Sequence, residues 1–189
     1  MKPLDPEERA ALLGLAHRAL AQALRLPPTP PAAKAPAGRA GVFVTWTVDG
    51  ERRGSLGALA PSAALEQELA TLAVRAALED PRVPPISAAE APRARCTVAL
   101  AGPAWPIAGP EAIDVARHGL SVVNGAHAAV LLPSAAVAQG WDAATYLKHT
   151  CLRAGLRADA SRLPDTRVLA FEVVEVSDDP AAGAPASEP

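Results

Sequence analysis

The residues best able to do chemistry lie together in one short segment, Arg52–Gly57, which reads Arg-Arg-Gly-Ser-Leu-Gly. It combines two guanidinium groups, a hydroxyl and two glycines just after an Asp-Gly turn signal. Glycines permit unusual backbone angles and a close approach of a ligand, and successive amides can form a concavity that binds anions. The segment is therefore a candidate binding site, with these proposed ligand contacts: Arg53, Gly54, Ser55 and Gly57.

The same segment also has a structural interpretation, which composition alone favours. A β-bulge followed by a loop would need the two glycines. Arg52 and Arg53 would then simply be solvated. Both interpretations stay open at this point.

Known catalytic sequence patterns do not fit the segment. The nucleophile elbow requires glycine two residues before the serine, where this chain has Arg53. The sequence contains no Gly-Lys-Ser/Thr phosphate loop and no dinucleotide-binding fingerprint. A serine hydroxyl also needs a base, and no spacing ties any of the four histidines to Ser55. Ser55 is kept as a candidate nucleophile, with Asp80 or a histidine as its helper.

Two further charged residues, Asp80 and Arg82, stand where a predicted helix meets a proline-rich run. The simplest interpretation is a local ion pair that fixes the loop and contributes at most about 1 kcal/mol if exposed. The alternative is that both side chains face a ligand. Asp80 and Arg82 therefore join the candidate ligand-binding residues.

Metal, cofactor and nucleic-acid binding have little support. His149 and Cys151 are two residues apart, which on a helix directs them about 200° from each other. Cys96 and Cys151 form no CxxC pair, so reduced and buried thiols are expected. The net charge of −2 gives no general attraction for nucleic acid, and no basic stripe accompanies the three tryptophans. We expect no metal, no evident cofactor and no nucleic-acid partner.

The sequence also indicates where in the cell the protein is expected to be. No apolar run approaches the ~18–20 residues that span a bilayer. The N-terminal residues lack the basic and then apolar pattern of a secretory signal. We therefore expect a soluble, cytoplasmic protein without a membrane partner.

Helical signals frame the first part of the chain. Asp5 can cap a helix that has Pro6 at its first position and Glu8 completing a capping box, and that ends near Leu26. A connection rich in proline and alanine, residues 27–40, follows. A second helix is predicted to open at Pro61 and Ser62 and to stop before Asp80-Pro81.

Strand signals alternate with these helices. Apolar residues alternate along Val42–Val48, and Asp49-Gly50 predicts a type I′ hairpin turn. Further strands are predicted at 95–101, 120–123, 128–132 and 168–176, short helices near 134–140 and from Asp142 to Gly155, and a disordered acidic tail at 177–189. Helices mixed with antiparallel hairpins, without regular βαβ alternation, indicate an α+β fold.

The motifs, taken in order, resemble one family. Gly41–Thr45, Arg53–Gly57 and Asp80–Pro85 resemble successive blocks of the AMMECR-one domain. Further matching blocks follow in the same order: Leu132-Pro133, Gly140–Asp142, Tyr146-Leu147 and Arg153–Leu156. The resemblance covers about residues 5–176.

This resemblance implies a single domain over residues 1–176 with a two-lobed α+β fold and antiparallel sheets flanked by helices. Its signature segment, usually Leu-Arg-Gly-Cys-Ile-Gly, would lie near a cleft between the lobes. The resemblance also implies Memo-like proteins and radical S-adenosylmethionine (SAM) enzymes as partners, in the AmmeMemoRadiSam system. Here Arg52 replaces the usual leucine and Ser55 the usual cysteine, so a thiol mechanism is not expected.

Three hypotheses of function follow. The favoured one is a binding or accessory component that holds a small anionic or polar group at a cleft around Arg53–Gly57 while a partner performs the chemistry. The second is an enzyme that uses Ser55 to modify RNA, a nucleotide or a small molecule, as has been suggested for the family without a defined reaction. The third is a structural scaffold.

Overall fold

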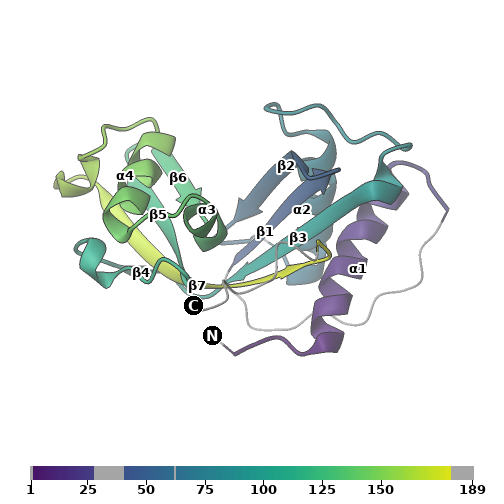
Figure 1. The fold of residues 1–189 in the computed structure, drawn as a ribbon, viewed down its shortest axis with the longest axis horizontal. Helices are drawn as coiled ribbons and strands as arrows, with labels where there is room; N and C mark the ends of the chain where they lie inside the picture. The colour runs from purple at the N-terminus through teal and green to yellow at the C-terminus, as the bar shows by residue number, and fades with distance from the viewer. Residues whose placement is uncertain (1, 28–40, 62, 180–189) are drawn as a thin grey trace. The chain divides into compact units, whose positions relative to one another are not determined.

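The structure is a computed structural model that describes residues 2–27, 41–61 and 63–179 (Figure 1). Most of the predicted connection at 27–40 and residues 180–189 of the predicted tail therefore lie outside the described residues. The chain divides into two compact units. Of the described residues, the N-terminal unit holds 2–100 and 174–179, and the C-terminal unit holds 101–173.

Helices and antiparallel strands share the fold, which confirms the α+β prediction. The elements of the first hundred residues are α1 (Pro6–Ala23), β1 (Gly41–Val48), β2 (Glu51–Ala58), α2 (Leu65–Leu78), the 3-10 turn η1 (Ala91–Arg93) and β3 (Ala94–Ala101). Those that follow are β4 (Trp105–Pro106), η2 (Pro110–Ala112), β5 (His118–Asn124), β6 (His127–Leu131), α3 (Pro133–Ala138), α4 (Ala143–Arg153), η3 (Ala160–Arg162) and β7 (Arg167–Ser177).

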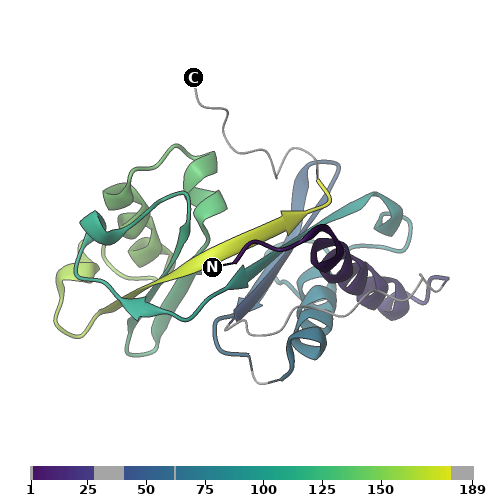
Figure 2. The same cartoon turned by 90° about the horizontal axis from the view of Figure 1, so that it is seen from below.

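The strands are ordered β2-β1-β3-β7-β5-β6, and β4 pairs with β7. The β1–β2, β4–β7, β5–β6 and β5–β7 pairs are antiparallel. β7 is one uninterrupted strand (Figure 2), and its last four residues, 174–177, belong to the N-terminal unit. β2 therefore lies at an edge of the strand order, with its outer backbone groups facing away from β1.

Helix α1 begins as its sequence predicts. The amide of Glu8 donates to the Asp5 carboxylate at 2.8 Å, and the amide of Asp5 donates to Glu8 at 3.0 Å, which is a capping box. The helix ends at Ala23, before the predicted Leu26. Arg25 adopts a left-handed φ of 56°, and the amide of Leu26 donates back to the Ala21 carbonyl, so the chain turns early.

The hairpin between β1 and β2 confirms its turn signal. Asp49 and Gly50 have φ values of 53° and 83°, as a type I′ turn requires. Alternate residues of β1 are buried against α1 and α2 in one apolar core: Val42, Val44, Trp46 and Val48. The intervening residues of β1 therefore point to the opposite face of the strand pair.

Helix α2 starts later than predicted, at Leu65 instead of at Pro61 and Ser62, and Ser62 itself is outside the described residues. The first helical bond runs from the amide of Glu68 to the carbonyl of Ala64, and no side chain caps this end. The helix ends at Leu78, before the proline-rich run, as predicted.

The C-terminal unit packs α3 and α4 against β5, β6 and β7 around Tyr146, whose hydroxyl donates to the Leu131 carbonyl at 2.8 Å. The Asn124-Gly125 hairpin and the Asp142 helix cap form as predicted. The separate helices at α3 and α4 were also predicted.

The start of the predicted disordered tail is wrong. Ser177 is still in β7, and the Asp178 carboxylate accepts a hydrogen bond from the amide of Cys96 at 2.6 Å. The amide of Asp178 also donates to the Cys96 carbonyl. Acidic composition suggested a tail, but these bonds to β3 hold residues 177–179 in the N-terminal unit.

Within the described ranges, no helix has the length and apolar character needed to cross a membrane.

Candidate functional site

The Arg52–Gly57 segment lies inside strand β2. Thr47 pairs with Arg52 and Trp46 pairs with Gly54, so Arg53 is the extra residue of a β-bulge. The predicted bulge is therefore confirmed. The loop that was to follow it is wrong, because residues 54–58 remain paired with β1.

Both glycines of the segment are required by the protein's own packing. Gly54 has a φ of 154°, and a Cβ atom there would lie 1.7 Å from the carbonyl oxygen of Ala76 in α2. A Cβ atom on Gly57 would lie 1.9 Å from the ring of Phe43. The space that the glycines leave open is thus filled by α2 and by Phe43.

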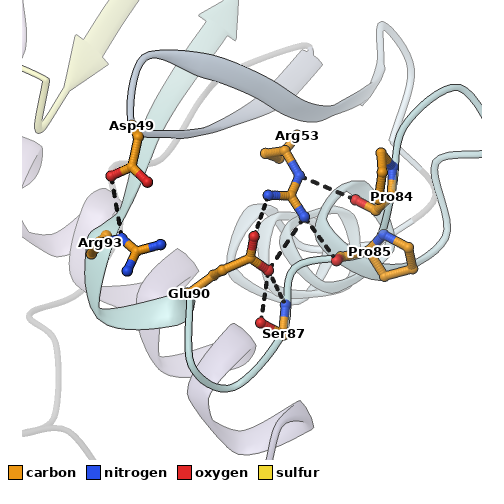
Figure 3. A network of polar contacts seen from close by, with 7 residues as sticks. All are labelled: Asp49, Arg53, Pro84, Pro85, Ser87, Glu90 and Arg93. Atoms are coloured by element: carbon orange, nitrogen blue, oxygen red, sulfur yellow. Dashed lines mark hydrogen bonds and ion pairs between the residues drawn. The ribbon is translucent and has the colours of Figure 1, made fainter.

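Arg53 is bound within the N-terminal unit and is not solvated as the structural interpretation assumed (Figure 3). Its Nη1 donates to Glu90 at 2.5 Å, its Nη2 donates to Glu90 at 3.3 Å and to the Pro85 carbonyl at 3.0 Å, and its Nε donates to the Pro84 carbonyl at 3.4 Å. The side chain is only 15% exposed. Arg53 therefore fixes the loop after α2.

Glu90 completes this cluster. It accepts hydrogen bonds from the hydroxyl and the amide of Ser87 at 2.7 and 3.0 Å (Figure 3). The bond from Arg53 and then those from Ser87 lower the pKa of Glu90 to about 2. Nearby, Arg93 pairs with Asp49 of the hairpin turn at 3.2 Å. This group of residues stabilises the fold of the loop.

Asp80 and Arg82 form the predicted ion pair. The pair is not only local, because both side chains also bond to the backbone of Ser55 in β2. Asp80 accepts from Arg82 Nε at 2.7 Å and from Arg82 Nη2 at 2.6 Å. It also accepts from the amides of Arg82 and Ser55 at 3.1 and 2.9 Å. The Asp80 side chain is only 2% exposed, so removing one partner of this pair costs more than breaking an exposed pair would.

The pair substitutes for a neighbouring strand at the outer edge of β2. The amide of Ser55 donates to Asp80, and the carbonyl of Ser55 accepts from Arg82 Nη2 at 2.7 Å. Both outward backbone groups of Ser55 are thereby satisfied. The structure brings three of the candidate residues, Ser55, Asp80 and Arg82, together and places Arg53 in a separate cluster with Glu90.

The Ser55 hydroxyl lies 2.9 Å from the Thr45 hydroxyl, on the face of the strand pair opposite the apolar core. Among the described residues, no titratable side chain hydrogen-bonds to it. The four bonds that Asp80 accepts, those from Arg82 foremost, hold the pKa of its carboxyl well below the ordinary value. Asp80 is thus a poor base for Ser55.

Arg82 carries an accessible positive charge beside Ser55. Its side chain is 43% exposed, and Asp80 and Ser55 engage Nε and Nη2. Within the described part of the chain, Nη1 has no hydrogen-bond partner. Bonding to Asp80 raises the pKa of Arg82, so the guanidinium stays charged.

The histidines and cysteines lie elsewhere. His17 pairs with Asp178, and His149 stacks on Trp141 with ring centroids 4.1 Å apart. Cys96 and Cys151 are buried free thiols, and burial raises the pKa of each. No group of three metal-ligating side chains occurs in the described residues.

Sequence reasoning missed Thr45, Glu90 and Ser87. Thr45 could be paired with Ser55 only if the bulge were placed at Arg53, since the bulge shifts the register by one residue. Glu90 lies 37 residues from Arg53, and no local pattern links them.

The comparisons with known proteins agree on one family. The AMMECR1 family model matches residues 13–176, so the chain belongs to the AMMECR1 (AMMECR-one) family. A Thermofilum pendens protein is 36% identical over 195 residues, covering 91% of this chain and 90% of its own length. Protein MK0488 of Methanopyrus kandleri is 34% identical over 182 residues, with 89% and 87% covered.

A solved structure supports the fold. The crystal structure of the uncharacterized protein PH0010 from Pyrococcus horikoshii has a TM-score of 0.84 to this chain. It is 30% identical and covers 93% of this chain and 94% of its own. The family and the fold are thereby established.

Proposed function

We propose that the chain is a binding or accessory component whose recognition site is formed by Ser55, Arg82 and the β2 edge between them. The observation that carries this proposal is the position of Arg82. The buried Asp80 holds the guanidinium against Ser55 and leaves Nη1 without a partner among the described residues. A guanidinium held in this way is ready to bind an anionic or polar group without further ordering.

The proposal changes one part of the sequence hypothesis. Arg53 was expected to contact the ligand, but Glu90 and two backbone carbonyls already occupy four of its donor positions. Arg82, for which a local ion pair was the simplest interpretation of the sequence, takes that role. Asp80 acts as a positioning residue because it contacts Arg82 and the Ser55 amide.

The partners belong to the proposal as well. Membership of the AMMECR1 family supports a role beside a Memo-like protein and a radical SAM enzyme, which would perform the chemistry in the cytoplasm. The ligand group would then be presented at Arg82 and Ser55.

The alternative is an enzyme in which Ser55 acts as nucleophile. It requires a base for the hydroxyl, yet the hydroxyl bonds to Thr45, and the lowered pKa of Asp80 makes this carboxylate a weak proton acceptor. A binding role needs no such base and is therefore the better supported of the two.

Binding measurements with purified partners test the proposed function. Immobilised protein is offered a Memo-like protein and a radical SAM enzyme from the same genome, separately and together. We expect retention by the unaltered chain and at least about tenfold weaker retention by Arg82→Gln. Arg75→Gln, which removes only an exposed pair with Glu79 on α2, is the matched control. Equal retention of the two variants would contradict the proposal.

A further inference from the structure

The hydrogen atoms that remain free at this site define the chemistry of its ligand. We infer that the site binds a phosphate-type oxyanion, through Arg82, the Thr45–Ser55 hydroxyl pair and Arg52. This inference rests on the proposed function and specifies which chemical group is recognised there.

The first step concerns the two hydroxyls. Thr45 Oγ1 and Ser55 Oγ are 2.9 Å apart, so one of them donates to the other. That bond uses one of the two hydroxyl hydrogens, and the second hydrogen is left to donate to a ligand. The pair therefore offers a donor on the face opposite the apolar core.

The second step concerns Arg82. Asp80 and the Ser55 carbonyl take the hydrogens of Nε and Nη2, which fixes the plane of the guanidinium. Both hydrogens of Nη1 remain without an acceptor in the described residues. Because Nη2 is 2.7 Å from the Ser55 carbonyl oxygen, these donors lie at the same residue as the hydroxyl pair.

The third step adds a second cation. Arg52 is exposed and pairs with Thr47, which lies two residues from Thr45 on the same face of β1. Two residues of a strand span about 7 Å, a distance that an arginine side chain covers. None of the described residues forms an ion pair or hydrogen bond with the Arg52 side chain.

The groups left free are the Nη1 donors of Arg82, one hydroxyl hydrogen, the Arg52 guanidinium and the neutral lone pairs of the two hydroxyls. Among the described residues, the carboxylate in contact with these groups is that of Asp80, which is buried and already accepts four hydrogen bonds. The donors approach from the strand edge, from the strand face and from the next position along that face. Tetrahedral phosphate oxygens accept from such divergent directions, whereas a planar carboxylate presents two oxygens in one plane. Arginine side chains also favour phosphate.

The experiment is an NMR titration of the full ¹⁵N-labelled chain with inorganic phosphate, with acetate at matched ionic strength as the comparison. A phosphate monoester forms a third arm, which separates an esterified ligand from the free ion. We expect saturable shifts centred on the amides of Thr45, Ser55 and Arg82, with acetate at least about tenfold weaker.

Three variants assign the donors. Arg82→Gln is expected to weaken phosphate binding about tenfold or more and Arg52→Gln about threefold, while Arg75→Gln leaves it unchanged. Arg52→Gln removes no contact of the fold, so it remains informative if Arg82→Gln unfolds. Equal binding of acetate and phosphate, or unchanged affinity in Arg52→Gln and Arg82→Gln, would overturn the inference.

A further arm separates this inference from the proposed function. The same amides are followed while the Memo-like protein is added. If these amides respond to the partner but not to phosphate, the oxyanion inference fails and the binding role stands. If they respond to neither, both fail.

Discussion

Arg53 joins a carboxylate to two backbone carbonyls of the N-terminal unit and Arg82 joins one to a single carbonyl, but which partner is the more buried is reversed between the two pairs. In the first pair the arginine is the more buried partner, at 15% exposed against 26% for Glu90. In the second pair the carboxylate is buried, with Asp80 at 2% and Arg82 at 43%. A buried arginine holds a loop in place, whereas a buried carboxylate directs an arginine outward.

The two pairs meet different residues of the Arg52–Gly57 segment: Arg53 bonds to Glu90, and Ser55 bonds to Asp80 and Arg82. Arg53 ties β2 to the loop at Pro84 and Pro85, so the loop keeps its path. That same loop carries Asp80 and Arg82 at its start. The Arg53–Glu90 pair therefore supports the Asp80–Arg82 pair, where we propose that a ligand binds, and we expect the two pairs to respond differently to substitution.

Gly54→Ala should have the largest effect, because Gly54 lies between the two clusters. A Cβ atom would overlap the Ala76 carbonyl and would force a residue with a side chain to hold a φ of 154°. We expect a loss of about 4 kcal/mol in the free energy of unfolding, measured by urea denaturation. Gly50→Ala, where φ is 83° and the space is open, is the control, with a loss of about 1 kcal/mol. Equal losses would show that contact with α2 is unimportant.

Asp80→Ala should come next. It leaves the Ser55 amide without an acceptor and the Arg82 guanidinium with only the Ser55 carbonyl, at a cost of about 3 kcal/mol after allowance for the exposure of Arg82. Urea denaturation measures it, and the exposed neighbour Glu79→Ala should cost less than about 0.5 kcal/mol. A loss from Asp80→Ala as small as that of the control would remove the basis for its positioning role.

Arg53→Gln should destabilise less, by about 1–2 kcal/mol, since it removes hydrogen bonds to Glu90 and to two carbonyls at a partly solvated position. Its phosphate affinity should remain within about twofold of the unaltered chain. Urea denaturation measures the loss of stability, and the phosphate titration measures whether the affinity is unchanged. A tenfold loss of affinity with little loss of stability would assign Arg53 to the ligand instead.

The pH dependence should show the smallest of these effects. The pKa of Glu90 is lowered from 4.5 to about 2 in the folded protein. Its contribution to stability is therefore complete above about pH 4.5 and is lost as the pH falls through about 2. The decline in unfolding free energy between pH 5 and 2 should become shallower in Glu90→Gln than in the control Glu7→Gln at an exposed position of α1. An identical decline would contradict the Arg53–Glu90 pairing.

Much of the fold could be predicted because its signals are local. The Asp5 capping box, the Asp49-Gly50 turn and the apolar alternation of β1 each lie within a few residues of the chain. The predicted start of α2 was wrong because the helix begins at Leu65 after Ala64, which has no capping side chain and so leaves no local signal. The predicted start of the tail was wrong because Asp178 bonds to β3, 82 residues away.

Three of the named candidates, Ser55, Asp80 and Arg82, meet in one hydrogen-bond network. Their role in ligand binding stays a prediction, and their arrangement could not be predicted. Which arginine faces inward could not be predicted, because it depends on Glu90 and on the bulge at Arg53. Tertiary packing decides which of the two arginine side chains is buried.

The central claim is that Arg82 binds the ligand group while Arg53 holds the fold. The most direct measurement follows the side-chain Nε–H resonances of both arginines in one spectrum during titration with inorganic phosphate. We predict a saturable shift of the Arg82 resonance and an unchanged Arg53 resonance. A saturable shift of Arg53 with Arg82 unmoved would contradict the account.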